Sequence, residues 1–179
     1  MELVGATYLY TLATISITFV GFSTLFMIIR QTLGGAMSKF DVLLARNFLQ
    51  LGFIAVVGSL LPPLLSLFSL HEPTIWRVAS LFIAIFPLLF AVTYPTRRFA
   101  ATGTRMPKLV WSAMFALYVS GGVLLLNAVG RPLAPGPGLF ALGVSIIVFS
   151  SFQAFLNSLK FILSGVSGSP PSKSAAAPS

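Results

Sequence analysis

Residues 76–94, WRVASLFIAIFPLLFAVTY, form an apolar run whose single charged residue, Arg77, stands at its start. The following stretch, residues 95–108, PTRRFAATGTRMPK, is basic and contains Arg97, Arg98, Arg105 and Lys108. A bilayer core about 30 Å thick is crossed by a helix of about 20 apolar residues. This part of the chain therefore predicts a transmembrane helix followed by a cationic connection.

The same pattern recurs along the chain, and its 11 basic and 3 acidic residues lie at or beyond the ends of the apolar runs. The predicted spans are 6–29, 48–70, 76–94, 109–129 and 139–161. Only 8% of the residues are charged and 56% are hydrophobic, whereas soluble domains carry about 25% charged residues. The sequence therefore predicts an all-α, polytopic integral membrane protein with five transmembrane helices.

Residues 1–163 form the predicted transmembrane domain. Residues 164–179, SGVSGSPPSKSAAAPS, hold few apolar side chains. Such a composition cannot bury enough surface to offset the entropy of ordering. This segment is therefore expected to be a disordered cytoplasmic tail.

The basic residues alternate between the two sides of the predicted membrane. Nine of the eleven fall on one side: Arg30, Lys39, Arg46, Arg97, Arg98, Arg105, Lys108, Lys160 and Lys173. Arg77 and Arg131 fall on the other. Because short cytoplasmic loops are enriched in Lys and Arg, we expect the N-terminus outside and the C-terminus in the cytoplasm. The same rule explains the net charge of +8 without a nucleic-acid partner. Short loops and the Arg-rich inner rim favour the plasma (bacterial inner) membrane.

Prolines and aromatic residues add detail to these spans. Pro62-Pro63 and Pro87 remove backbone donors and are expected to kink the second and third helices. Residues from Pro95 to Pro107 are expected to form a plain connection. Aromatic rings with a polar edge favour the headgroup layer, and the rings expected there are Tyr8, Tyr10, Trp76, Tyr94 and Trp111.

The first span carries a row of small and hydroxyl residues at alternating spacings of four and three, which places them on one helix face. We call this row the threonine stripe: Thr7, Thr11, Thr14, Thr18 and Gly21. It is either the wall of an aqueous path or a helix-packing surface, because Thr hydroxyls can bond to backbone carbonyls and small residues let helices approach.

Polar side chains also gather near the cytoplasmic ends of the second and fifth spans. The set comprises Arg46, Asn47, Gln50, Gln153, Asn157 and Lys160. It forms either a cationic inner vestibule or a rim of side chains that reach toward water. Arg97, Arg98, Arg105 and Lys108 are candidates for binding lipid headgroups, although orientation alone also explains them.

Catalysis is disfavoured because no two acidic residues share both a membrane depth and a loop in which paired carboxylates could act. Cysteine is absent, which excludes thiolate metal sites, and His71-Glu72 lacks the second His that a zinc motif needs. We therefore expect no enzyme activity, no metal and no cofactor.

Two functions remain open. The favoured one is an oligomeric passive channel or facilitator for small anions or neutral solutes. The alternative is an accessory or scaffolding membrane subunit that packs against a partner's transmembrane helices. The expected partners are the lipid bilayer and either further copies or a partner membrane subunit.

Overall fold

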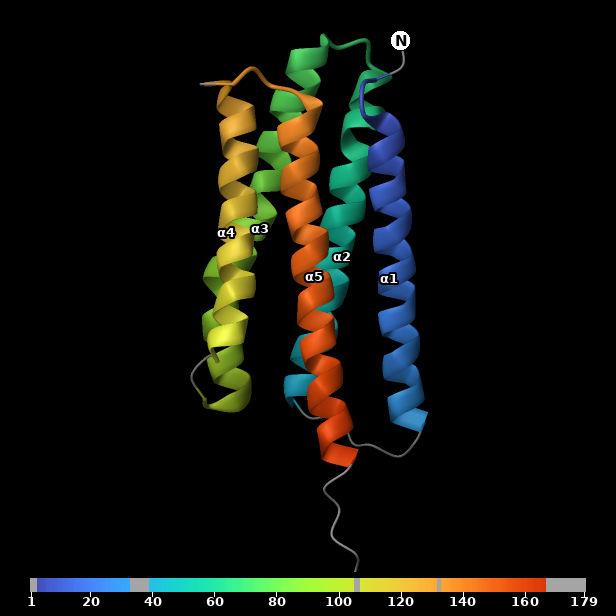
Figure 1. Cartoon of the computed structure of the whole chain (residues 1–179), viewed down its shortest axis with the longest axis vertical. Coiled ribbons are helices and arrows are strands. Elements are labelled where there is room, and N and C mark those ends of the chain that lie inside the picture. Colours follow the sequence, from blue (N-terminus) through green and yellow to red (C-terminus); the bar gives the residue numbers. More distant parts are fainter. Residues whose placement is uncertain (1–2, 33–38, 105–106, 132, 167–179) are drawn as a thin grey trace, which may run out of the picture.

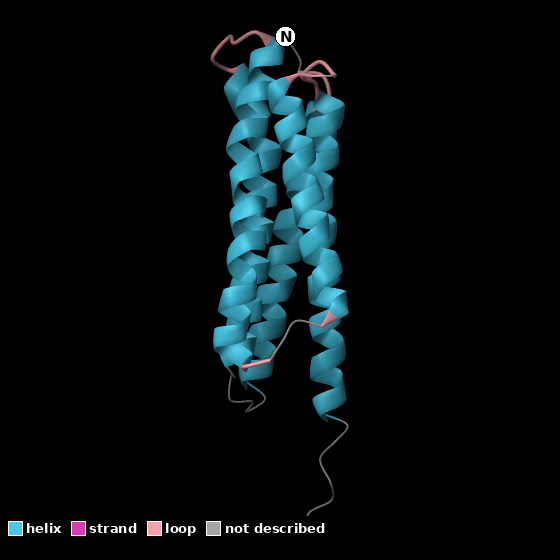
Figure 2. Cartoon of the chain, turned by 90° about the vertical axis from the view of Figure 1, so that its left-hand side faces the viewer, coloured by secondary structure: helices cyan, strands magenta, loops and turns pink. Residues whose placement is uncertain are grey.

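A computed structural model of the chain describes residues 3–32, 39–104, 107–131 and 133–166. The regular elements in these ranges are helices: α1 (Ala6–Thr32), α2 (Lys39–Ser66), α3 (Glu72–Thr102), α4 (Lys108–Val129) and α5 (Pro137–Val166). They stand side by side in an elongated bundle (Figure 1, Figure 2). Each is long and apolar enough to cross a membrane. The prediction of an all-helical, multi-pass membrane protein is confirmed.

Four of the helices form a bundle, and the fifth lies against its side. Helices α2, α3, α4 and α5 contact one another in a ring, while α1 packs against α2 and α5. Figure 1 shows α1 at one edge of the molecule and α4 at the other. The N-terminus lies at the same end as the α2–α3 and α4–α5 connections, and the α3–α4 connection lies at the opposite end. We call these the N-terminal end and the opposite end of the bundle.

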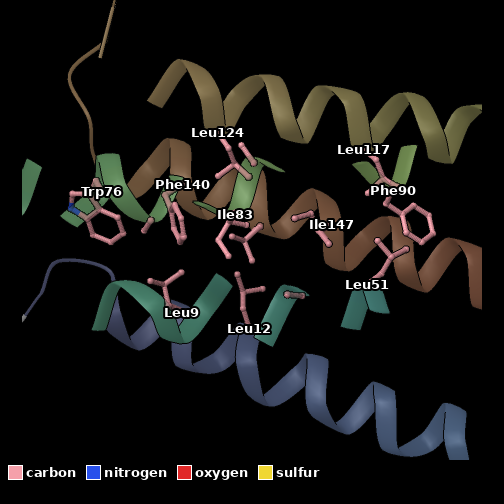
Figure 3. Close-up of a cluster of buried hydrophobic side chains, with 14 of the residues drawn as sticks. Leu9, Leu12, Leu51, Trp76, Ile83, Phe90, Leu117, Leu124, Phe140 and Ile147 are labelled. Atoms are coloured by element: carbon pink, nitrogen blue, oxygen red, sulfur yellow. The ribbon is translucent and has the colours of Figure 1, made fainter. Parts of the chain in front are cut away.

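Large apolar side chains fill the centre of the bundle along its length (Figure 3). Near the N-terminal end the rings of Trp76 and Phe140 pack with centroids 5.5 Å apart. Ile83, Leu117 and Leu124 are fully buried farther along the axis. Since protein interiors are packed as densely as organic crystals, these side chains fill the space between the helices of one chain.

Glycines allow α4 to approach its two neighbours closely. An added Cβ at Gly121 would lie 2.6 Å from the Cγ of Leu88 on α3, and one at Gly143 of α5 would lie 2.6 Å from the Cγ of Leu124 on α4. The Ser120 hydroxyl donates a hydrogen bond of 2.7 Å to the Gly143 carbonyl. Small residues and interhelical hydrogen bonds are the usual means of helix association in membranes.

Helix α3 is longer than predicted and includes most of the expected connection after Pro95. It ends at Thr102, where Gly103 adopts φ 64° and its N–H donates to the Phe99 carbonyl at 2.8 Å. A proline within a helix removes one donor but does not prevent the following residues from remaining helical when the surroundings support them. Pro62, Pro63 and Pro87 also lie inside helices, and the predicted kinks there stay predictions.

Two of the five aromatic residues expected at the headgroup layer are buried inside the bundle. Trp76 is buried, and its Nε1 donates to Glu72 Oε1 at 3.3 Å. Tyr94 is buried and stacks on Phe90. Tyr8, Tyr10 and Trp111 are exposed. The position of an aromatic residue in the sequence indicates its depth along a span, but it does not indicate whether the ring faces lipid or the inside of the bundle.

The domain boundary predicted at residue 163 falls within a helix, because α5 continues to Val166. The rest of the predicted tail lies outside the described residues, so its expected disorder stays a prediction.

Candidate functional site

The threonine stripe faces away from the bundle. Its five members are exposed, whereas the opposite face of α1, including Leu9, Leu12 and Ser16, is buried. An added Cβ at Gly21 would meet no atom within 4 Å. A wall or a packing surface built on the stripe must therefore involve a second chain.

Two of the stripe's hydroxyls bond within α1 itself. Thr11 Oγ1 donates to the Thr7 carbonyl at 3.0 Å, and Thr14 Oγ1 donates to the Tyr10 carbonyl at 2.9 Å. These groups meet their need for a hydrogen-bond acceptor without water, so the face can rest against lipid or another helix at little polar cost.

Three kinds of contact hold α1 to α2 and α5. The Tyr8 hydroxyl and Ser145 Oγ lie 2.9 Å apart. Phe19 packs edge-on against Phe155 with ring centroids 5.2 Å apart. Gly52 of α2 leaves room for the side chain of Val20. These contacts fix the rotation of α1 and hence the outward direction of the stripe.

Polar side chains of the predicted inner vestibule pair across neighbouring helices at the opposite end. Arg97 Nη1 of α3 donates to Gln50 Oε1 of α2 at 3.5 Å, the long limit of a hydrogen bond. Gln153 Nε2 of α5 donates to Ser112 Oγ of α4 at 3.4 Å. Asn47 is buried, and its Oδ1 accepts no hydrogen bond. The side chains of Asn157 and Lys160 lie outside the described part of the chain.

This end of the bundle is cationic in the described residues. Arg46 and Lys108 are exposed, and Arg97 and Arg98 are partly buried. Arg98 Nη1 donates to the Tyr94 hydroxyl at 3.4 Å. Glu72, the acidic residue whose side chain is described, lies at the N-terminal end of the bundle. Arg105 of the predicted headgroup set lies outside the described residues.

A buried polar network near the N-terminal end was missed by the sequence reasoning. Asn127 of α4 is fully buried. Its Nδ2 donates to Ser80 Oγ of α3 at 2.8 Å, and its Oδ1 accepts from the Gly136 amide in the α4–α5 connection at 2.9 Å. The available signal was a lone Asn within an apolar span, since a polar group in lipid has to find a partner.

Among the residues that the structure describes, no group of three or more His, Asp or Glu side chains could hold a metal ion. The arrangement instead offers an outward small-residue face on α1, a cationic end and a structural network around Asn127.

The chain matches no protein-family model, no curated protein and no solved structure.

Proposed function

We propose that the protein is a non-catalytic accessory or scaffolding subunit that works by packing α1 against a transmembrane helix of another chain. The observation that carries this proposal is the outward threonine stripe on a helix whose other face is already fixed to α2 and α5. Small residues permit the close backbone approach that drives helix association in lipid. The hydrogen bonds of Thr11 and Thr14 to their own backbone suit such a contact.

The expected orientation belongs to the same proposal. The described cations Arg46, Arg97, Arg98 and Lys108 share the end of the bundle opposite the N-terminus, while Arg77 and Arg131 share the N-terminal end. The enrichment of basic residues on the cytoplasmic side supports an N-terminus outside and a C-terminus inside. In a bacterium the membrane would be the inner membrane.

An oligomeric passive channel for small anions or neutral solutes is the second candidate. The packed core of the single chain supports a route between copies rather than through one chain, with the threonine stripe as its wall. The cationic end of the bundle favours anions over metal cations at that mouth. This function requires contact between copies of the same chain, whereas the accessory function requires a different partner.

Replacing Thr14 by Phe is expected to weaken the complex about fivefold to about 100-fold, because overpacking a close helix contact costs about 1–3 kcal/mol. The measurement is the particle mass of the protein extracted with its native lipids, compared between wild type and variant over a dilution series. If the stripe also lines a channel, chloride flux into liposomes falls in the same variant while potassium flux stays low.

The matched control is Val92→Phe on the exposed face of α3, since Val and Thr have nearly the same shape. We expect this variant to keep the wild-type mass. If Thr14→Phe also keeps the wild-type mass at every dilution, α1 is not the assembly face. If chloride flux through Thr14→Phe equals that of the wild-type protein, α1 does not line a conducting path.

A further inference from the structure

We propose that Arg46, Gln50 and Arg97 form a binding site for the phosphate group of an anionic phospholipid. The site lies where α2 and α3 meet at the end opposite the N-terminus. It is independent of the α1 contact proposed above, so the two proposals can fail separately.

The geometry places the Arg97 cation against the Gln50 amide, with Arg46 one helical turn from Gln50 on α2. Arg46 and Gln50 are four residues apart on α2 and therefore neighbours on one face of that helix. Gln50 Oε1 accepts a hydrogen bond from Arg97 Nη1 of α3 at 3.5 Å. Arg46 is thus one turn from Gln50 on α2, and the Arg97 guanidinium contacts the Gln50 side chain from α3.

The polar groups at this junction are mostly donors. Between described residues Arg97 uses one N–H on Gln50 Oε1, and the guanidinium and the Gln50 amide nitrogen carry further N–H groups. Arg46 is exposed. A phosphate group offers several acceptor oxygens and negative charge, and the guanidinium fork fits such oxygens two at a time. The chemistry selects a phosphate oxyanion.

The position along the helices favours a lipid as the source of that phosphate. The apolar span of α2 begins at Val42, so Arg46 and Gln50 lie within its first turns. Arg97 lies near the end of the long helix α3. Basic groups at such a boundary attract anionic headgroups, whereas Arg98, its neighbour in sequence, is directed to Tyr94. The orientation rule explains why cations occur at this end but not why an amide joins two helices there.

The test is a titration of the purified full-length protein with phosphatidylglycerol or phosphatidylcholine, with bound lipid counted by native mass spectrometry. A charge-assisted hydrogen bond to a phosphate oxygen contributes at least about tenfold in affinity. The Arg46→Gln/Arg97→Gln variant is therefore expected to bind phosphatidylglycerol at least about 100-fold more weakly. Gln50→Leu keeps both charges and is expected to lose about threefold to fivefold through its missing amide donors.

The matched control is Arg77→Gln/Arg131→Gln, which removes the same charge from the other end of the bundle and should lose less than about threefold. Equal losses in the two double variants would overturn the proposal in favour of a diffuse charge effect. Unchanged binding in Gln50→Leu would overturn the three-residue site.

Inorganic phosphate is titrated as a separate ligand. If it binds in a way that requires Arg46 and Arg97 while phosphatidylglycerol does not bind, the lipid source is wrong and the ligand is a soluble phosphate.

Discussion

Gly121→Val is expected to lower the free energy of unfolding by about 3 kcal/mol, whereas Gly122→Val changes it by less than about 1 kcal/mol. The first added Cβ would lie 2.6 Å from the Cγ of Leu88, and the second would meet no atom within 4 Å. Overpacking a dense core costs about 1–3 kcal/mol, and here it also pushes α3 away from α4. The measurement is unfolding in mixed micelles with increasing SDS.

The adjacent pair forms its own control. Both variants replace Gly by Val inside α4, so the change in helix propensity is closely matched between them. Equal destabilisation by the two variants would contradict the close approach of α3 to α4 at Gly121.

Asn127→Leu is expected to lower the free energy of unfolding by about 2 kcal/mol. The substitution leaves the Ser80 hydroxyl and the Gly136 amide without the partner they have in the folded protein. Hydrogen bonds between membrane helices contribute about 0.6 kcal/mol on average and up to about 1.7 kcal/mol, and a stranded polar group adds a desolvation cost. The same SDS titration measures the effect.

Asn47→Leu provides the comparison for Asn127→Leu. Both residues are buried, but Asn47 Oδ1 accepts no hydrogen bond. We expect this substitution to cost less than about half as much. A double-mutant cycle with Ser80→Ala isolates the Asn127–Ser80 bond, and a coupling energy near zero would show that this bond does not stabilise the fold.

The number and approximate limits of the spans could be predicted from the sequence, because charges interrupt apolar runs wherever the chain leaves the lipid. The end of α3 could not. Pro95 suggests a boundary, but the helix continues to Thr102. A helix tolerates the loss of one donor when its surroundings support the following turn.

The direction of each helix face was also beyond the sequence. In a soluble protein an apolar stripe points inward, but in lipid both faces of a helix are apolar and only packing sets its rotation. The periodicity of the threonine stripe placed its members on one face of the first span, and the contacts of Tyr8, Phe19 and Val20 turn that face outward. Asn127 was missed for the same reason, since its partners come from α3 and from the α4–α5 connection.

The central claim is that the outward face of α1 contacts protein rather than lipid. The most direct test places the photo-crosslinking residue p-benzoylphenylalanine at position 10, where an exposed tyrosine already stands beside the stripe, or, as control, at position 92, and irradiates intact membranes. We expect a discrete protein adduct from position 10 and only lipid adducts from position 92. An adduct of twice the chain mass would identify a second copy, and a different mass would identify another subunit. Lipid adducts alone at both positions would contradict the claim.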